Sequence, residues 1–274
     1  MKIEIPKHID LSHPERYILT FAIEKEKIGF SIYSPIENGS FFYYAPKKFP
    51  TANLLSGFQE MLFDNEFLTL PFRKVYALNR TEAFTFVPSI LFKEEDIPSY
   101  MDFLFDKNEK VLHHALPFYD FTTLHSIDKE LYGFLQRSYV TLTFIHHSAP
   151  ILSYIKLRLK TVNANKMLIN VTDEGIDMFC FSRDTFVLGN HFSCKEESDA
   201  VYYILYTWKQ LSFDQTKDFF YITGHLERRK NIMEALKDYV HHIIPLNIIP
   251  EAHFEQIEVG NVPFELTSLT LCEL

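Results

Sequence analysis

The stretch YILTFAIEKEKIGFSIY, residues 17–33, consists of two apolar runs on either side of the charged turn at 24–27. Two alternating apolar runs joined by a short polar turn are typical of a β-hairpin. A strand-like segment at 40–45, a segment with helical periodicity at 51–68 and another strand-like segment at 74–78 follow in that order. This part of the chain therefore predicts a β-β-β-α-β unit.

The second half of the chain repeats this order. Its segments are a hairpin KMLINVTDEGIDMFCF (166–181), a strand FVLGNHF (186–192), a helix DAVYYILYTWKQL (199–211) and a strand FFYITG (219–224). When the two hairpins are aligned without a gap, Phe21 falls on Ile169. The alignment of the later strands, which places Asn79 on Gly224, differs from this register by three residues. Few positions are identical, so chance similarity is the alternative to a tandem duplication of one unit.

Composition argues against two classes of partner. The net charge of −9 and the pI of about 5.7 disfavour nucleic-acid binding, because phosphate contacts require clustered Lys and Arg. The one dense basic run, Arg228-Arg229-Lys230, is interpreted as a solvated helix face. The sequence has no signal-peptide pattern and no apolar run of the ~18 residues that a membrane helix requires. We expect a cytoplasmic protein with neither nucleic-acid binding nor membrane insertion.

Recognisable catalytic motifs are missing from the sequence. It contains no P-loop, no G-x-S-x-G and no HExxH, and only eight glycines. The cysteines Cys180, Cys194 and Cys272 lack metal-type spacing and indicate a reducing compartment. In the histidine pairs 113–114, 146–147 and 241–242 we expect one ring to be buried and the other to meet solvent. We predict no catalytic residue and no metal site, and a metal site built from separate strands is the alternative.

The element order is similar to that of a known superfamily. A three-strand meander followed by helix, strand, helix and strand, present twice, resembles the ribonuclease H-like fold as duplicated in actin-like ATPases. The hairpin openings, the segment TFVPSILFKEEDIPSYM (85–101) and the junction ITGH (222–225) resemble an uncharacterised bacterial family of Bacteroidetes type, a domain of unknown function with that fold. The resemblance implies an α/β protein with two tandem ribonuclease H-like subdomains, each a mixed five-stranded sheet flanked by helices. The first lobe with its connecting helix would span 1–160, and the second 161–274.

The resemblance also locates a nucleotide site. Active members have a D-x-G turn in the first hairpin of each half, which contacts the phosphates and the metal, and a glycine pair near the adenosine. The first-half turn at 24–27 has neither aspartate nor glycine, whereas the second-half turn keeps the spacing in Asp173 and Gly175. Thr223-Gly224-His225 keeps one glycine and has histidine in place of the other. We favour the interpretation that these glycines serve a tight hairpin and a strand-to-helix turn, and a nucleotide contact is the alternative.

Together these features predict a non-catalytic protein with a degraded nucleotide site that acts as a binding or assembly module. It would bind a protein partner, through an aromatic-rich cleft between the two lobes or through an exposed aromatic strand at 41–45, and would need no cofactor. The interpretation leans against an enzyme. The alternative is an ATP-binding enzyme or switch with altered phosphate motifs. It would use Asp173 for magnesium and Gly224 for the nucleoside, with Gly175, Thr223 and His225 as further nucleotide contacts.

Overall fold

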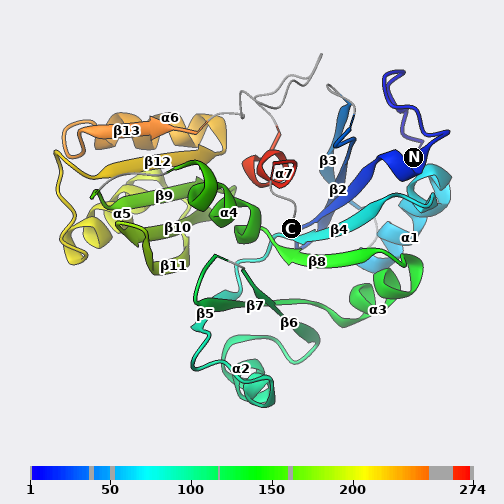
Figure 1. Cartoon of the computed structure of the whole chain (residues 1–274), viewed down its shortest axis with the longest axis horizontal. Helices are drawn as coiled ribbons and strands as arrows, with labels where there is room; N and C mark the ends of the chain where they lie inside the picture. Colours follow the sequence, from blue (N-terminus) through cyan, green and yellow to red (C-terminus); the bar gives the residue numbers. More distant parts are fainter. Residues whose placement is uncertain are drawn as a thin grey trace. The chain divides into compact units, whose positions relative to one another are not determined.

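The computed structural model describes residues 2–36, 40–49, 53–116, 118–159, 163–246 and 262–271. The chain divides into two compact units, and each is described by itself (Figure 1). Unit 1 comprises residues 1–151 and 250–274, and unit 2 comprises residues 152–249. Cys180 and Cys194 are buried free thiols, and Cys272 lies outside the described residues.

A mixed five-stranded sheet forms the centre of unit 1. It contains β1 (Ile18–Ile23), β2 (Lys27–Tyr33), β3 (Phe41–Lys48), β4 (Lys74–Asn79) and β8 (Leu142–His146), in the order β3-β2-β1-β4-β8. The meander β1-β2-β3 is antiparallel, and β4 and β8 continue the sheet in parallel with β1. The predicted hairpin, third strand and later strand are confirmed. The aromatic strand at 41–45 is an edge strand, but its Phe41 is buried and Phe42, Tyr43 and Tyr44 are half-buried.

Both faces of this sheet are covered from within unit 1. Alternating side chains of β1 and β2 pack against α1 (Leu54–Asp64) and α3 (Lys129–Ser138) on one face, where Phe21 meets the ring of Phe58 edge-on at 5.0 Å. The opposite face packs against the short helix α7 (Phe264–Leu269), all of whose residues are buried. Residues from α7 and its approach, Val262, Leu266 and Leu269, form this second core layer with Ile18, Ala22, Tyr33, Phe41, Tyr76, Leu78 and Ile145.

A small antiparallel sheet is an addition that the sequence did not predict as a separate layer. It contains β5 (Phe84–Pro88), β6 (Glu109–Ala115) and β7 (Phe121–Asp128) in the order β5-β7-β6. The connection from β5 to β6 carries the short helices η3 (Glu94–Asp96) and α2 (Ile97–Leu104). Unit 1 further contains η1 (Pro14–Arg16) and η2 (Glu66–Thr69).

Unit 2 has the same sheet connectivity as the large sheet of unit 1. Its strands are β9 (Lys166–Val171), β10 (Gly175–Ser182), β11 (Thr185–Ser193), β12 (Phe219–Gly224) and β13 (His242–Pro245), in the order β11-β10-β9-β12-β13. The helices α5 (Glu197–Gln210) and α6 (Leu226–Leu236) pack on one face around the buried Trp208 and Ile232. This α/β architecture, with two mixed five-stranded sheets flanked by helices, is the predicted fold class and fits a duplicated two-lobe fold.

The helix α4 (Ser148–Arg158) joins the two units, as the predicted connecting helix does. The compact units group α7 with unit 1, whereas the predicted second lobe runs to residue 274. The predicted boundary at 160/161 stays a prediction. Among the described helices, none combines the length and the apolar composition that a bilayer crossing requires.

Candidate functional site

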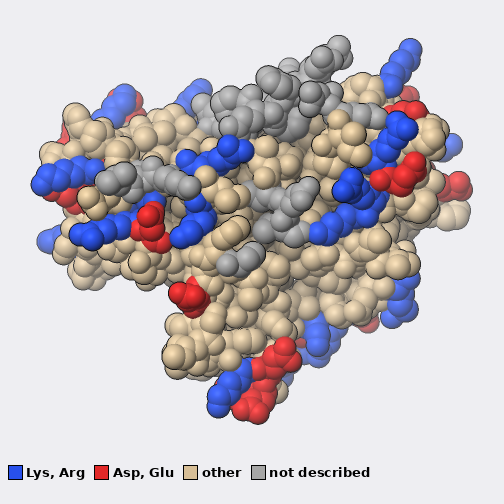
Figure 2. All heavy atoms as spheres, in the orientation of Figure 1, with Lys and Arg blue, Asp and Glu red and all other residues tan. Residues whose placement is uncertain are grey.

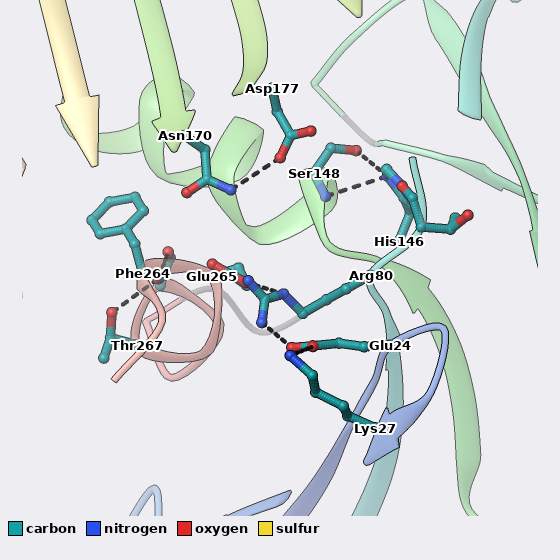
Figure 3. Close-up of polar contacts among 12 residues, drawn as sticks. Glu24, Lys27, Arg80, His146, Ser148, Asn170, Asp177, Phe264, Glu265 and Thr267 are labelled. Atoms are coloured by element: carbon teal, nitrogen blue, oxygen red, sulfur yellow. Dashed lines mark hydrogen bonds and ion pairs between the residues drawn. The ribbon is translucent and has the colours of Figure 1, made fainter. Parts of the chain in front are cut away.

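The hairpin turn of the first sheet is occupied by an ion-pair network. Glu24 follows β1 and Arg80 follows β4, and because these parallel strands pair Ile23 with Asn79, the two side chains leave the sheet at the same edge. The guanidinium Nη1 of Arg80 forms an ion pair with the carboxylate of Glu24, and its Nε lies 2.7 Å from Oε1 of Glu265 on α7 (Figure 3). Arg80 is thus held between two carboxylates from distant parts of unit 1.

Burial sets the electrostatics of this network. Glu265 is only 1% exposed, and an ionised carboxylate at such depth is stable only when a cation compensates for its lost hydration. Lys27 supplies a second cation to Glu24, with Nζ 3.9 Å from Oε2. Burial also raises the pKa of the nearby Tyr43, so its hydroxyl stays neutral. A phosphate at this turn would have to compete with both carboxylates for Arg80, in a loop that lacks glycine.

The hairpin turn of the second sheet is closed by an arginine from α6. The Nη1 of Arg228 donates to the carbonyl oxygens of Thr172 at 2.6 Å and Asp173 at 3.0 Å. Its Nη2 donates to the carbonyl oxygen of Cys194 at 3.0 Å. The adjacent Arg229 donates to the carbonyl oxygen of Leu246 at 3.3 Å. The interpretation of this basic run as a solvated face is therefore wrong for both arginines, which hold loops at the end of the sheet.

Both glycines of the predicted nucleotide site are required by the backbone. Gly224 has a φ of 90°, and a Cβ there would lie 2.1 Å from the carbonyl oxygen of Val171. A Cβ on Gly175 would lie 2.2 Å from the carbonyl oxygen of Phe192 in the neighbouring strand. Close strand pairing accounts for both residues without a ligand.

The structure brings the predicted nucleotide-binding residues of unit 2 to one end of its sheet. The amide of His225 donates to the carbonyl oxygen of Val171 at 2.9 Å, which places the end of β12 beside the turn that carries Asp173 and Gly175. Thr223 is buried, whereas Asp173 and His225 are exposed. The ring of His225 caps α6 by accepting from the amide of Arg228 at 3.5 Å. Whether these residues bind a nucleotide stays a prediction.

A buried polar row in the same sheet was missed by sequence reasoning. Cross-strand pairing aligns Asn170 with Asp177 and Asp177 with His191. The Oδ2 of Asp177 accepts a hydrogen bond from Nδ2 of Asn170 at 3.0 Å (Figure 3). The Nδ1 of His191 lies 2.8 Å from Oδ1 of Asp177. The available signal was a single acid within the otherwise apolar run GIDMFCF, which indicates a buried acid with partners.

A buried histidine cluster in unit 1 was also missed. The ring centroids of His125 on β7 and His146 on β8 are 5.1 Å apart, and those of His146 and His147 are 4.1 Å apart. Nδ1 of His146 lies 2.7 Å from Oγ of Ser148, while neither ring nitrogen of His125 has a hydrogen-bond partner among the described residues. Burial lowers the pKa of His125 to about 3. The pair 146–147 is wholly buried, so the expectation of one solvent-facing ring is wrong there.

The two hairpin turns differ in the carboxylates that they present. Magnesium takes hard oxygen ligands, and the described residues contain no group of three His, Cys, Asp or Glu side chains with metal-binding geometry. In unit 1 both acids of the turn are ion-paired, Glu24 with Arg80 and Lys27, and Glu26 with Lys48, whereas in unit 2 Asp173 and Glu174 of the turn are exposed.

Comparison with known proteins identifies relatives of this architecture. The family model described as protein of unknown function (DUF3822) matches residues 6–243. A crystal structure from Bacteroides thetaiotaomicron, of a protein with actin-like ATPase fold and unknown function, is similar with a TM-score of 0.81 and 28% sequence identity, over 96% of this chain and 99% of that chain. The PilM-PilN type IV pilus biogenesis complex is similar with a TM-score of 0.54 and 12% identity, over 94% of this chain and 97% of that one, which shows the fold alone. No curated protein sequence matches the chain significantly.

Proposed function

This chain belongs to the family described as protein of unknown function (DUF3822), and we propose that it is a non-catalytic protein with an actin-like ATPase fold that acts as a binding or assembly module. The observation that carries the proposal is the Glu24–Arg80–Glu265 network at the first hairpin turn. In active members of the superfamily this turn contacts phosphate and metal. Here Glu24 of the turn is committed to Arg80, whose other carboxylate partner, Glu265, is buried.

The second hairpin turn supports the same proposal. Gly175 and Gly224 are explained by strand contacts, and Arg228 is engaged by backbone carbonyl oxygens. A guanidinium already satisfied by carbonyl oxygens is a poor donor to an incoming phosphate, because binding would leave those oxygens unpaired. Under this proposal the protein requires no cofactor.

Catalysis is tested by phosphate release from ATP in the presence of magnesium. We expect the purified full chain to release phosphate at the rate of the buffer alone. Release that is proportional to protein concentration and abolished by Asp173→Ala would show that the protein is an enzyme.

A second candidate is a nucleotide-binding switch, favoured by the convergence of Asp173, Gly175 and residues 223–225 at one end of the sheet in unit 2. Calorimetric titration of the full chain with ATP and with ADP, each with magnesium, separates the two candidates. A saturable heat of binding that is lost in Asp173→Ala supports the switch. No heat of binding at millimolar nucleotide supports the binding module. Gly224 is unsuitable for this test, because any side chain there collides with β9.

A further inference from the structure

The connection between β5 and β6 in unit 1 exposes several large apolar side chains. Ile90 is 91% exposed, Leu91 64%, Phe103 87% and Leu104 42%. The helix α2 has the sequence IPSYMDFL and contains no buried residue. Helices in proteins gain most of their stability from burying an apolar face, and two turns are too short to be stable alone in water. We call Ile90, Leu91, Phe103 and Leu104 the α2 surface.

The segment that contains α2 is rich in acidic side chains, which we call the acidic rim. Residues 93–107 contain five carboxylates and two lysines, and the carboxylates are Glu94, Glu95, Asp96, Asp102 and Asp106. Glu94 and Glu95 are largely exposed. The Nζ of Lys93 lies 3.7 Å from Oε1 of Glu95. The Oε1 of Glu94 lies 3.4 Å from Nε2 of His113. In Figure 2 acidic side chains lie beside basic ones at the lower tip, where Figure 1 places α2.

We propose that the α2 surface docks a protein segment that presents apolar side chains flanked by Lys or Arg. Apolar residues of the segment would cover Phe103 and its neighbours, and its cations would meet the acidic rim. The proposal rests on the binding-module function and names the surface and the partner chemistry for it.

Charge decides between this occupant and two others. A second copy of the chain would bring two acidic rims together in a protein of net charge −9, and like charges across an interface oppose association. An anionic bilayer would repel the same rim, because membrane-binding surfaces are basic. A basic apolar protein segment is the occupant that satisfies both the exposed aromatic residue and the carboxylates.

The test uses a random library of about 12-residue peptides displayed on phage and selected on the immobilised full chain. We expect the enriched peptides to combine large apolar residues with a positive net charge. One enriched peptide, synthesised with a fluorophore, is then measured by anisotropy. Its affinity is expected to fall about tenfold or more in Phe103→Ser and in Ile90→Ser, and to weaken as salt rises.

The matched control is Phe63→Ser on α1, since Phe63 is 84% exposed and lies on another element of unit 1. It should bind the peptide as the unmodified protein does. Three results would overturn the proposal: enriched peptides without a positive excess, binding that survives Phe103→Ser, or no enrichment. Self-association in sedimentation, or binding to vesicles with one quarter phosphatidylglycerol, would also overturn it if lost in Phe103→Ser. Nucleotide titration tests the proposed function independently of this experiment, because the predicted nucleotide site does not include α2.

Discussion

Gly224 shows how one residue can resemble a ligand contact and yet be explained by the backbone. Its φ of 90° lies in a region that L side chains rarely adopt, and its α-carbon approaches the backbone of Val171. The sequence predicts a glycine turn between strand and helix at this position, and the structure confirms the turn. The strand contact that makes glycine necessary depends on pairing with β9, which local sequence does not reveal.

Gly224→Ala should therefore destabilise the protein strongly. We expect a loss of about 1–3 kcal/mol from backbone strain, and more from the collision with Val171, measured by urea denaturation. The control is Gly133→Ala inside α3, where a Cβ meets only the flexible end of Arg137, at 3.3 Å. That variant should be neutral or more stable by up to about 1 kcal/mol. Equal effects in the two variants would contradict this explanation of Gly224.

Asp177 should be essential for stability, in contrast to the exposed Asp173. Asp177→Ala leaves the amide of Asn170 and the ring of His191 without their acceptor, so we expect a loss of about 3–5 kcal/mol. Asp173→Ala should change the free energy of unfolding by less than about 0.5 kcal/mol. Both are measured by denaturant titration. A mild effect of Asp177→Ala would show that the polar row contributes little to the fold.

His125 should make the protein less stable in mild acid. Burial lowers its folded pKa to about 3, whereas in the unfolded chain it titrates near 6.5, so the unfolded state binds more protons between these values. Its contribution is complete above pH 6.5 and decreases as the pH falls, by about 2 kcal/mol at pH 5. His114, whose pKa burial also lowers, acts in the same direction. Unfolding of His125→Phe between pH 5 and 7 should depend less on pH than that of the unmodified protein, and an unchanged slope would contradict the assignment.

Other residue-scale contacts could not be predicted, for a physical reason. Glu265 and Arg80 are far apart in the chain and pair only once α7 packs on the sheet. The sequence pattern predicts Arg228 on a charged helix face. The carbonyl oxygens that it binds belong to other elements, so the local sequence does not reveal them. Asp173 and Gly175 were identifiable because their turn is local in sequence.

At the scale of elements, periodicity predicts those that pack through their own pattern. The apolar alternation in β1, β2, β9 and β10 and the helical spacing in α1 and α5 identify them without tertiary information. The sequence does not predict β5, β7 and β6 as a separate sheet, because β5 pairs with β7, which lies more than 30 residues later in the chain. The helix α7 is buried on all sides, so FELTSL lacks the amphipathic pattern that would reveal it.

The packing of α7 leads to a stability prediction. Leu266 on α7 is 1% exposed, within the core layer that covers one face of the sheet in unit 1. Leu266→Ala should cost about 2–5 kcal/mol through lost burial and a residual cavity. The control is Leu226→Ala on α6, where the leucine is partly exposed, and a clearly smaller loss is expected. If thermal and urea denaturation show equal losses, α7 contributes little to the core.

For the whole molecule, element order was sufficient to predict the fold class, and the relatives confirm it. The predicted meander-helix-strand units correspond to the two five-stranded sheets, and the actin-like ATPase fold is shared with the protein from Bacteroides thetaiotaomicron. Function does not follow from the fold, because one fold can carry many unrelated sites. In this chain the two hairpin turns hold the Glu24–Arg80–Glu265 network and Arg228 with its carbonyl partners.

Thermal denaturation of the full chain with ATP or ADP and magnesium tests the central claim most directly. A site with a Kd of about 50 µM would add about 2.7 kcal/mol of stability at roughly 5 mM nucleotide. For a chain of this size such a gain raises the Tm by several degrees. The ion-paired first turn predicts no nucleotide-dependent change in Tm beyond that of magnesium alone. A rise in Tm that grows with nucleotide concentration and is lost in Asp173→Ala would contradict the proposal of a degraded site.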